Sequence, residues 1–276
     1  MKKIYAEFLS ILVVSFVLFF SLSAFDTIEI LGLELKTSGM LDHLISVPEE
    51  AEMELGAESE VVSASNADNS VAVAKVVAPQ RREIDETPQT ILFIGDSMLE
   101  GLYPRLAAYA VENGHTLYSV IWYSSTSEVW GRSTKLADYI ARVKPTYVFV
   151  SLGANELFVR DIATKRDKYV KTILSQIGDI PFVWIGPPNW KSDTGINDLV
   201  AKNVKSKKRG SFFLSNGMYF NRAKDGAHPT RKSASEWMDS VARWMPKNAA
   251  YPIKMNTPSV KTASAKKVFI HQPNEK

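Results

Sequence analysis

Short apolar runs alternate with amphipathic stretches over the middle of this 276-residue chain. Apolar runs bounded by Gly, Pro, Asn or Ser are typical of buried strands in a parallel sheet. Five strands are predicted, at 91–94, 117–122, 147–152, 182–185 and 212–214. Helical periodicity between them predicts helices at 98–112, 135–143, 168–177 and 233–245. The pattern therefore predicts an α/β fold, a three-layer α/β/α sandwich with a five-stranded parallel sheet.

The first 25 residues carry a different pattern, in which Lys2 and Lys3 precede an apolar run from Phe8 to Phe25. A basic start followed by an apolar run is typical of an export signal. The run nearly reaches the roughly 20 residues that span a hydrocarbon core, which favours an uncleaved membrane anchor. Cleavage after Ser23 is the alternative. Either way we expect export, with the anchored form in the inner membrane and its domain in the periplasm or outside the cell.

Composition divides the rest of the chain into three parts. Residues 26–89 become acidic and, beyond residue 47, lack aromatic side chains, which predicts a juxtamembrane segment and a disordered stalk. Residues 90–246 hold the predicted strands and helices. Residues 247–276 mix Lys, Asn, Pro, Ser and Thr without sustained periodicity, which predicts a flexible basic tail.

Charge and cysteine content exclude several classes of function. With 33 basic and 30 acidic residues the net charge is only +3, and there is no basic stripe interleaved with aromatic residues, so nucleic acid is not expected as a partner. The chain has no cysteine, which excludes a disulfide framework, a thiolate nucleophile and cysteine-ligated zinc. Neither a phosphate-binding loop nor a known metal-ligand spacing occurs, so we expect no metal and no organic cofactor.

A candidate nucleophile follows the first predicted strand, in the sequence Gly95-Asp96-Ser97. A serine at a tight turn that opens a helix lies beside free backbone N–H groups and a partial positive charge. Both would stabilise the oxyanion that forms when a serine attacks an acyl carbon. An ordinary helix cap is the alternative for this motif taken alone.

A candidate acid–base pair follows the fifth strand, in the sequence Asp225-Gly226-Ala227-His228. An Asp three residues before a His can accept the Nδ1 proton and leave Nε2 free to take a proton from serine. The other three histidines lie before the stalk, in the tail, and in a turn at the opposite end of the sheet. His228 is therefore the histidine placed for catalysis, and a surface loop with Asp225 as helix cap is the alternative.

A candidate oxyanion donor follows the third strand, in the sequence Gly153-Ala154-Asn155. A neutral amide donor such as Asn155 stabilises a developing oxyanion without acting as a competing base. Taken alone, the motif is more typical of an Asn in a turn.

These three motifs, in this order and each beyond a predicted strand, resemble the SGNH (GDSL-like) hydrolase family over about residues 90–245. The resemblance implies a flavodoxin-like fold and a triad of Ser97, Asp225 and His228. It also implies an oxyanion hole made by the Ser97 amide, the Asn155 side chain and the backbone amide of a glycine after the second strand. That loop departs from the family pattern, because it begins Tyr123-Ser124-Ser125 and has no glycine before Gly131. Ser125 takes the glycine's place by spacing, and Gly131 is the other candidate.

The implied activity is hydrolysis of acyl esters through an acyl-enzyme. Four tryptophans lie in or after strands that end at the predicted site: Trp122 and Trp184 are expected to pack in the core, whereas Trp130 and Trp190 are candidate contacts to substrate. Export and the family resemblance favour O-acetyl esters of carbohydrate or cell-envelope glycans. The alternatives are an O-acyltransferase acting on an envelope polysaccharide or peptidoglycan, and a non-catalytic carbohydrate-binding module. The sequence does not indicate an oligomeric state.

Overall fold

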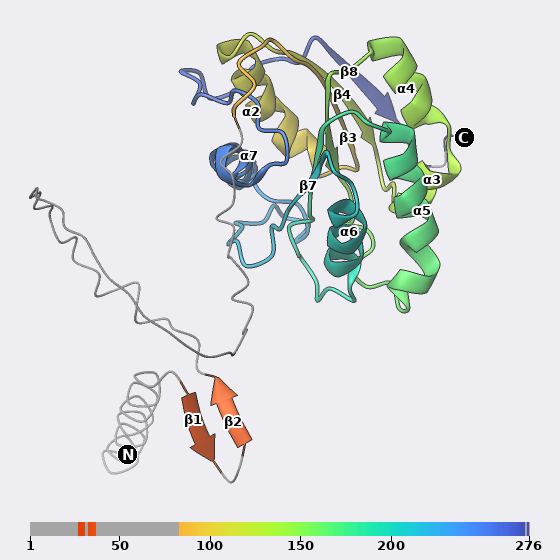
Figure 1. The fold of residues 1–276 in the computed structure, drawn as a ribbon, viewed down its shortest axis with the longest axis vertical. Coiled ribbons are helices and arrows are strands. Elements are labelled where there is room, and N and C mark those ends of the chain that lie inside the picture. The colour runs from red at the N-terminus through yellow and green to blue at the C-terminus, as the bar shows by residue number, and fades with distance from the viewer. Residues whose placement is uncertain (1–26, 31–32, 37–82, 274, 276) are drawn as a thin grey trace, which may run out of the picture. The chain divides into compact units, whose positions relative to one another are not determined.

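The structure is a computed structural model that describes residues 27–30, 33–36, 83–273 and 275 (Figure 1). The anchor predicted at 1–25 and most of the predicted stalk lie outside these residues. The chain divides into two compact units, Met1–Val73 and Ala74–Lys276. Within the ranges described here, no helix combines the length and the apolar character needed to cross a membrane.

The first unit contains two short strands, β1 (Thr27–Ile30) and β2 (Leu33–Lys36). They pair antiparallel, with Thr27 opposite Lys36 and Ile30 opposite Leu33. Both strands fall in the segment 26–89, so its first residues form a strand pair. A single pair of this length is marginally stable by itself.

The second unit is built on a six-stranded sheet in the order β7-β6-β5-β3-β4-β8. Every neighbouring pair in this sheet is parallel. The strands are β3 (Thr90–Gly95), β4 (Thr116–Trp122), β5 (Tyr147–Ser151), β6 (Phe182–Ile185), β7 (Gly210–Phe213) and β8 (Lys267–His271). The first five correspond to the five predicted strands, and β8 is additional.

Helices cover both faces of this sheet (Figure 1). They are α2 (Leu99–Glu112), α3 (Ser127–Arg132), α4 (Lys135–Val143), α5 (Ile162–Ile177), α6 (Ile196–Lys205) and α7 (Arg231–Asn248). Alternation along β3 separates two hydrophobic clusters: Ile91 and Phe93 pack toward α2 and α7, whereas Leu92 and Ile94 pack toward α3 to α6. The predicted three-layer α/β/α class is confirmed.

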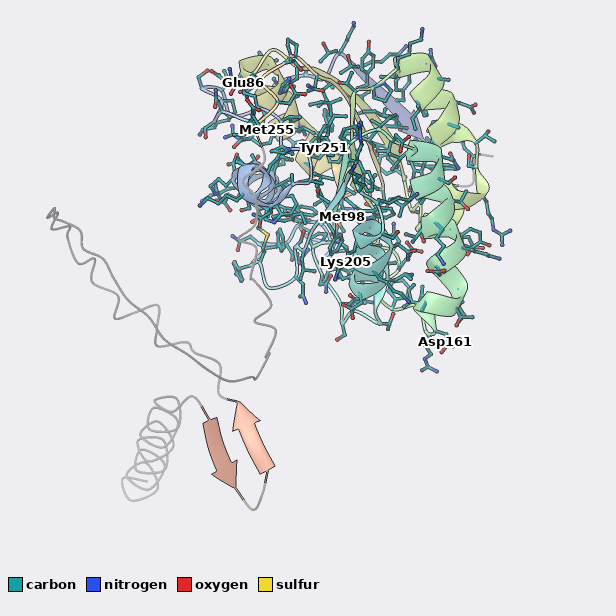
Figure 2. All side chains as sticks on the ribbon, in the orientation of Figure 1. Glu86, Met98, Asp161, Lys205, Tyr251 and Met255 are labelled. Atoms are coloured by element: carbon teal, nitrogen blue, oxygen red, sulfur yellow. The ribbon has the colours of Figure 1, made fainter. Side chains whose placement is uncertain are left out.

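The prediction that residues 247–276 form a flexible tail is wrong, because residues after α7 pack on the domain. Ile253 is buried, and the segment that holds Tyr251 and Met255 (Figure 2) is fixed where the Tyr147 hydroxyl donates to the Tyr251 carbonyl at 2.9 Å. The chain then enters the sheet as β8, whose Lys267 and His271 lie beside Tyr118 and Trp122 of β4. The residues that make these contacts are scattered along the segment and form no periodic pattern, so the sequence did not predict that the segment is ordered.

The domain also begins earlier than residue 90. Asp85 forms a parallel bridge with Ile253, in which the Asp85 N–H donates to the Pro252 carbonyl at 2.8 Å. The residues just before β3 therefore belong to the folded unit rather than to the stalk.

Candidate active site

Ser97 lies in the turn between β3 and α2, beyond the carboxyl end of the strand. Gly95 ends β3 so close to β5 that a Cβ there would lie 2.3 Å from the Ser151 carbonyl oxygen. Asp96 Oδ1 accepts from the Met98 N–H at 2.9 Å and closes the turn. Met98, the next residue after Ser97, is labelled in Figure 2. The turn leaves Ser97 partly exposed at the N-terminal end of α2.

His228 and Asp225 lie in the loop between β7 and α7, which is held by its own backbone. Asp225 Oδ1 accepts from the N–H groups of Ala227 and His228, at 2.9 and 3.0 Å. The Ala223 N–H donates to the His228 carbonyl at 2.8 Å. The Arg222 guanidinium donates to the carbonyl of Ala227 in this loop, at 2.8 Å. These bonds fix the loop before any substrate binds.

The structure brings Ser97, His228 and Asp225 together in one line. His228 Nε2 lies 2.8 Å from Ser97 Oγ, and His228 Nδ1 lies 2.7 Å from Asp225 Oδ2. Hydrogen bonds from the backbone N–H groups of His228 and Ala227, with the His228 ring, lower the pKa of Asp225 to about 2. An ionised carboxylate therefore faces Nδ1 at neutral pH, and this arrangement lets Nε2 accept the serine proton.

The loop after β4 corrects the expectation for Ser125. Its N–H donates to the Trp122 carbonyl at 3.1 Å, its hydroxyl accepts from Trp130 Nε1 at 3.0 Å, and its side chain is buried. Its carbonyl accepts from Asn155 Nδ2 at 2.9 Å. The N–H, hydroxyl and carbonyl of Ser125 thus all form hydrogen bonds within the protein, and its amide is not available to a bound oxyanion.

The neighbouring Ser124 instead lines the cavity that also contains Ser97, Asp225 and His228. Its φ of +55° lies in the left-handed region, which glycine adopts most easily. Gly131 does not reach the cavity. It lies in α3, where a Cβ would meet the Tyr169 Cβ of α5 at 2.7 Å, so this glycine permits close helix packing.

Asn155 is held beside Ser125 by the buried carboxylate of Glu156. Glu156 accepts from the N–H and the hydroxyl of Ser127, both at 2.8 Å, and from Arg166 Nε at 2.8 Å. Burial raises the pKa of Glu156, and the Ser127 and Arg166 hydrogen bonds oppose that shift. The loop after β5 is thereby tied to the loop after β4, a link that the sequence motifs did not indicate.

A second buried carboxyl, that of Asp96, lies directly before Ser97. Its side chain is 0% exposed, and among the described residues no group donates to Oδ2. Burial raises the pKa of Asp96 to about 7; the nearby Glu156 adds to the shift, and the Met98 N–H opposes it. A carboxyl with a free buried oxygen and a charged neighbour favours its protonated form.

Ser97, Asp225 and His228 line one cavity of about 780 Å³. Its other walls come from α2, α7, the loop after β4 and the tail. Most of these wall residues carry a hydroxyl or a charge, and they include Glu100, Tyr103, Tyr123, Ser124, Arg231 and Thr262. The Tyr123 hydroxyl donates to Glu100. The cavity is thus suited to a ligand with many hydrogen-bonding groups.

The tryptophans are mostly core residues. Trp130 is 0% exposed and packs edge-to-face on Trp122, so the prediction that it contacts substrate is wrong. Trp184 is also buried. Trp190 is half-buried; its Nε1 donates to the Ala154 carbonyl at 2.9 Å, and the Lys191 ammonium covers its ring. Trp190 supports the loop that carries Asn155 and is not part of the cavity wall.

No cluster of three or more His, Cys, Asp or Glu side chains that could hold a metal ion occurs within the described ranges. Ser, His and Asp in hydrogen-bonded order are residue types that can carry nucleophilic and acid–base chemistry.

The chain was compared with protein families, curated proteins and solved structures. No protein-family model and no curated protein matches the chain. Several solved structures are similar to it, among them the following three. The crystal structure of TesA is 18% identical, covering 55% of this chain and 96% of that one, with a TM-score of 0.47. The psychrotrophic esterase EstA from Pseudoalteromonas sp. is 18% identical, with coverages of 56% and 97% and a TM-score of 0.44. A family 3 carbohydrate esterase from Clostridium thermocellum is 15% identical, with coverages of 57% and 94% and a TM-score of 0.48.

Proposed function

We propose that this protein is a serine esterase of the SGNH hydrolase type, which hydrolyses acyl esters through Ser97, His228 and Asp225. The observation that carries the proposal is the pair of hydrogen bonds at 2.8 and 2.7 Å that joins hydroxyl, imidazole and carboxylate in order. These groups come from two loops far apart in sequence, both beyond the carboxyl ends of parallel strands. Such edges are where open α/β sheets bind ligands.

In the first half of the reaction, Ser97 Oγ attacks the ester carbonyl carbon while His228 Nε2 takes the hydroxyl proton. The Asp225 carboxylate stabilises the imidazolium through Nδ1. As the tetrahedral intermediate collapses, the imidazolium protonates the leaving alcohol and an acyl-Ser97 ester remains. In the second half, His228 takes a proton from water, the hydroxide attacks the acyl carbon, and the proton returns to Ser97 as the carboxylic acid leaves.

The oxyanion of each intermediate would be held by the Ser97 amide, the Ser124 amide and the Asn155 side chain. Asn155 uses one N–H of its amide on the Ser125 carbonyl, and an amide group carries two. The second N–H is the one assigned to the oxyanion. Loss of one such donor typically lowers the rate about 100- to 1000-fold.

The cavity wall favours a short acyl group on a hydroxyl-rich alcohol. A long fatty chain would require a continuous apolar wall, whereas here hydroxyls and charges from Tyr103, Tyr123, Arg231 and Thr262 dominate. Sugars offer matching donors and acceptors. We therefore assign O-acetyl esters of carbohydrate as the substrate class, and envelope glycans follow from the export signal proposed at residues 1–25.

A second candidate activity is transfer of the acyl group to a sugar hydroxyl. The same acyl-enzyme would form, and an acceptor hydroxyl would replace water in the second half. The cavity volume of about 780 Å³ exceeds what a small acetyl ester fills, which leaves space for an acceptor. A non-catalytic binding module is disfavoured, because binding a glycan does not require the aligned triad.

The proposal is tested with the full chain, purified in mild detergent, on p-nitrophenyl acetate. Ser97→Ala should lower kcat by at least about 1000-fold, because no nucleophile remains. Ser264→Ala, which removes an exposed hydroxyl outside the cavity, is the matched control and should leave kcat unchanged. Equal rates for wild type and Ser97→Ala would refute the esterase. Acetylated product from an added glucosamine oligomer would identify transfer.

A further inference from the structure

The segment 257–265, here called the C-terminal strap, crosses α2 before the chain enters β8. Its contacts with that helix are specific. The Ala263 N–H donates to the Pro104 carbonyl at 2.9 Å, and the N–H of Ser259 donates to Glu112 Oε2 at 3.0 Å. The strap is therefore attached at two points along α2.

A buried guanidinium fixes the middle of the strap. Arg105, whose side chain is 10% exposed, donates to the carbonyls of Val260 and Lys261 at 2.8 and 3.1 Å. Its Nε pairs with Asp239 of α7 at 2.7 Å, and the Tyr109 hydroxyl donates to the same Asp239 oxygen at 2.8 Å. Because a buried charge is costly unless it is paired, this cluster holds the strap in one position relative to α2 and α7.

The residue that follows this clamp, Thr262, lines the same cavity as Ser97 and His228. Its neighbours in the wall include Tyr103 of α2 and Ser235 of α7. Three hydroxyl-bearing residues from three separate segments therefore line one space. The Ser235 hydroxyl donates to the Arg231 carbonyl at 3.0 Å and can still accept a hydrogen bond. A hydroxyl can both donate and accept, which matches the hydroxyl groups of a sugar.

We propose that the C-terminal strap forms a sugar-binding subsite for the alcohol portion of the ester, with Thr262 as its contact residue and Arg105 as its positioning residue. The inference rests on the proposed esterase function and adds the part of the wall that selects a carbohydrate. The subsite binds the leaving group and takes no part in proton transfer. Its loss therefore affects sugar esters more than a small aryl ester.

Thr262→Trp tests this by filling the subsite, and Ser264→Trp is the matched control, since Ser264 is an exposed hydroxyl residue of the same strap outside the cavity. The substrates are 6-O-acetylglucose, an acetylated xylo-oligosaccharide and p-nitrophenyl acetate. Thr262→Trp should raise KM for the sugar esters more than about tenfold, since a filled pocket excludes its ligand. Its kcat/KM for p-nitrophenyl acetate should fall by a smaller factor than that for the sugar esters, and all values for Ser264→Trp should stay at the wild-type level.

Two milder variants keep the test clear of misfolding. Thr262→Val removes only the hydrogen-bonding capacity and should raise the sugar-ester KM about 3- to 10-fold. Arg105→Lys keeps the charge beside Asp239 but cannot hold two carbonyls in the same way, and should raise the sugar-ester KM by a larger factor than it lowers the sugar-ester kcat.

Unchanged KM for sugar esters in Thr262→Trp would overturn the subsite, and so would an equal loss on all three substrates. Wild-type protein that cleaves p-nitrophenyl acetate but neither sugar ester would also overturn it, while leaving the esterase in place. Failure of the esterase itself is recognised separately, by Ser97→Ala and wild type acting equally on p-nitrophenyl acetate.

Discussion

Two regions flank Ser97, and they hold their carboxyl groups in opposite surroundings. On one side, the loop between β7 and α7 leaves the Asp225 side chain 51% exposed, and hydrogen bonds lower its pKa to about 2. On the other side, Asp96 and Glu156 are 0% exposed, and burial raises the pKa of each. Asp225 is thus a permanent anion in contact with water, while the other two are polar groups inside a packed core.

The comparison shows that the surroundings of a carboxyl group, and not the residue type, determine what it does in this domain. An exposed carboxylate that accepts several N–H bonds keeps its charge and can orient an imidazole. A buried carboxylate is tolerated when it is fully paired, as Glu156 is by Ser127 and Arg166. It then serves to hold two loops together. Variants on the two sides should therefore fail in different ways: loss of catalysis on the exposed side, and loss of stability on the buried side.

Asp225→Asn should produce the largest effect on catalysis. The amide oxygen can still accept from the backbone N–H groups of Ala227 and His228, so the loop should keep its shape. An amide N–H facing Nδ1 favours the wrong tautomer of His228, and kcat should fall about 1000- to 10,000-fold. We expect an unchanged melting temperature. Steady-state kinetics with p-nitrophenyl acetate and a thermal melt measure both.

Glu236→Gln, an exposed change on α7, is the control for Asp225→Asn and should leave kcat unchanged. A loss of less than tenfold in Asp225→Asn, or a large drop in melting temperature, would contradict the comparison at its exposed side.

Glu156→Gln should act mainly on stability. The neutral amide loses the ion pair with Arg166 and one acceptor for Ser127, but Arg166 keeps its bond to Glu128 at 2.7 Å. Because the guanidinium is not left without a partner, we expect a loss of about 1 to 3 kcal/mol in the free energy of unfolding. A shift of the Ser124 turn would lower kcat by about 10- to 100-fold. Urea unfolding and kinetics measure the two effects.

Glu128→Gln is the matched control, since Glu128 binds Arg166 and Arg132 but does not contact Ser127. It should cost less than Glu156→Gln in stability and leave kcat near the wild-type value. Equal losses of stability and kcat in the two variants would show that ion pairing with Arg166, and not the link to Ser127, accounts for the effect of Glu156→Gln.

The sequence predicted the sheet core well because buried parallel strands are continuous apolar runs. It also predicted α4 to the residue, whereas α5 begins at Ile162 rather than Lys168 because Ile162 joins the buried stripe. The sequence analysis did not predict α3, which is a single short helix, or α6, although its buried apolar residues Ile196, Leu199, Val200 and Val204 follow helical spacing. It did not predict β8, because this edge strand begins with a lysine and is only partly buried.

The aligned residues of the site could be predicted because each belongs to a local motif at a strand end. The choice between Ser124 and Ser125 could not be made in this way. Two adjacent serines look alike in sequence, and only the backbone distinguishes the residue with a left-handed φ from the one whose amide is bonded. The place of Thr262 in the cavity could not be predicted either. It follows two residues whose carbonyls are bound by Arg105, which is distant in the sequence.

Asp96→Asn should have the smallest effect on catalysis and the clearest effect on pH dependence. Asn imitates the protonated acid, so we expect nearly wild-type kcat at pH 6. In the wild type, the folded-state pKa of about 7 lies above the unfolded value of 3.8, so between these pH values the folded protein holds a proton that the unfolded chain has lost. Stability from this group is therefore complete below about pH 4 and declines as pH rises toward 7, with a limiting slope of about 1.4 kcal/mol per pH unit.

The variant has no such proton to lose, so its free energy of unfolding should fall less than that of the wild type between pH 5 and pH 8. Urea unfolding at the two pH values measures the difference. Identical pH dependence in the two proteins would mean that Asp96 stays ionised beside Glu156, and the contrast between the two flanks of Ser97 would then lie in exposure alone and not in charge.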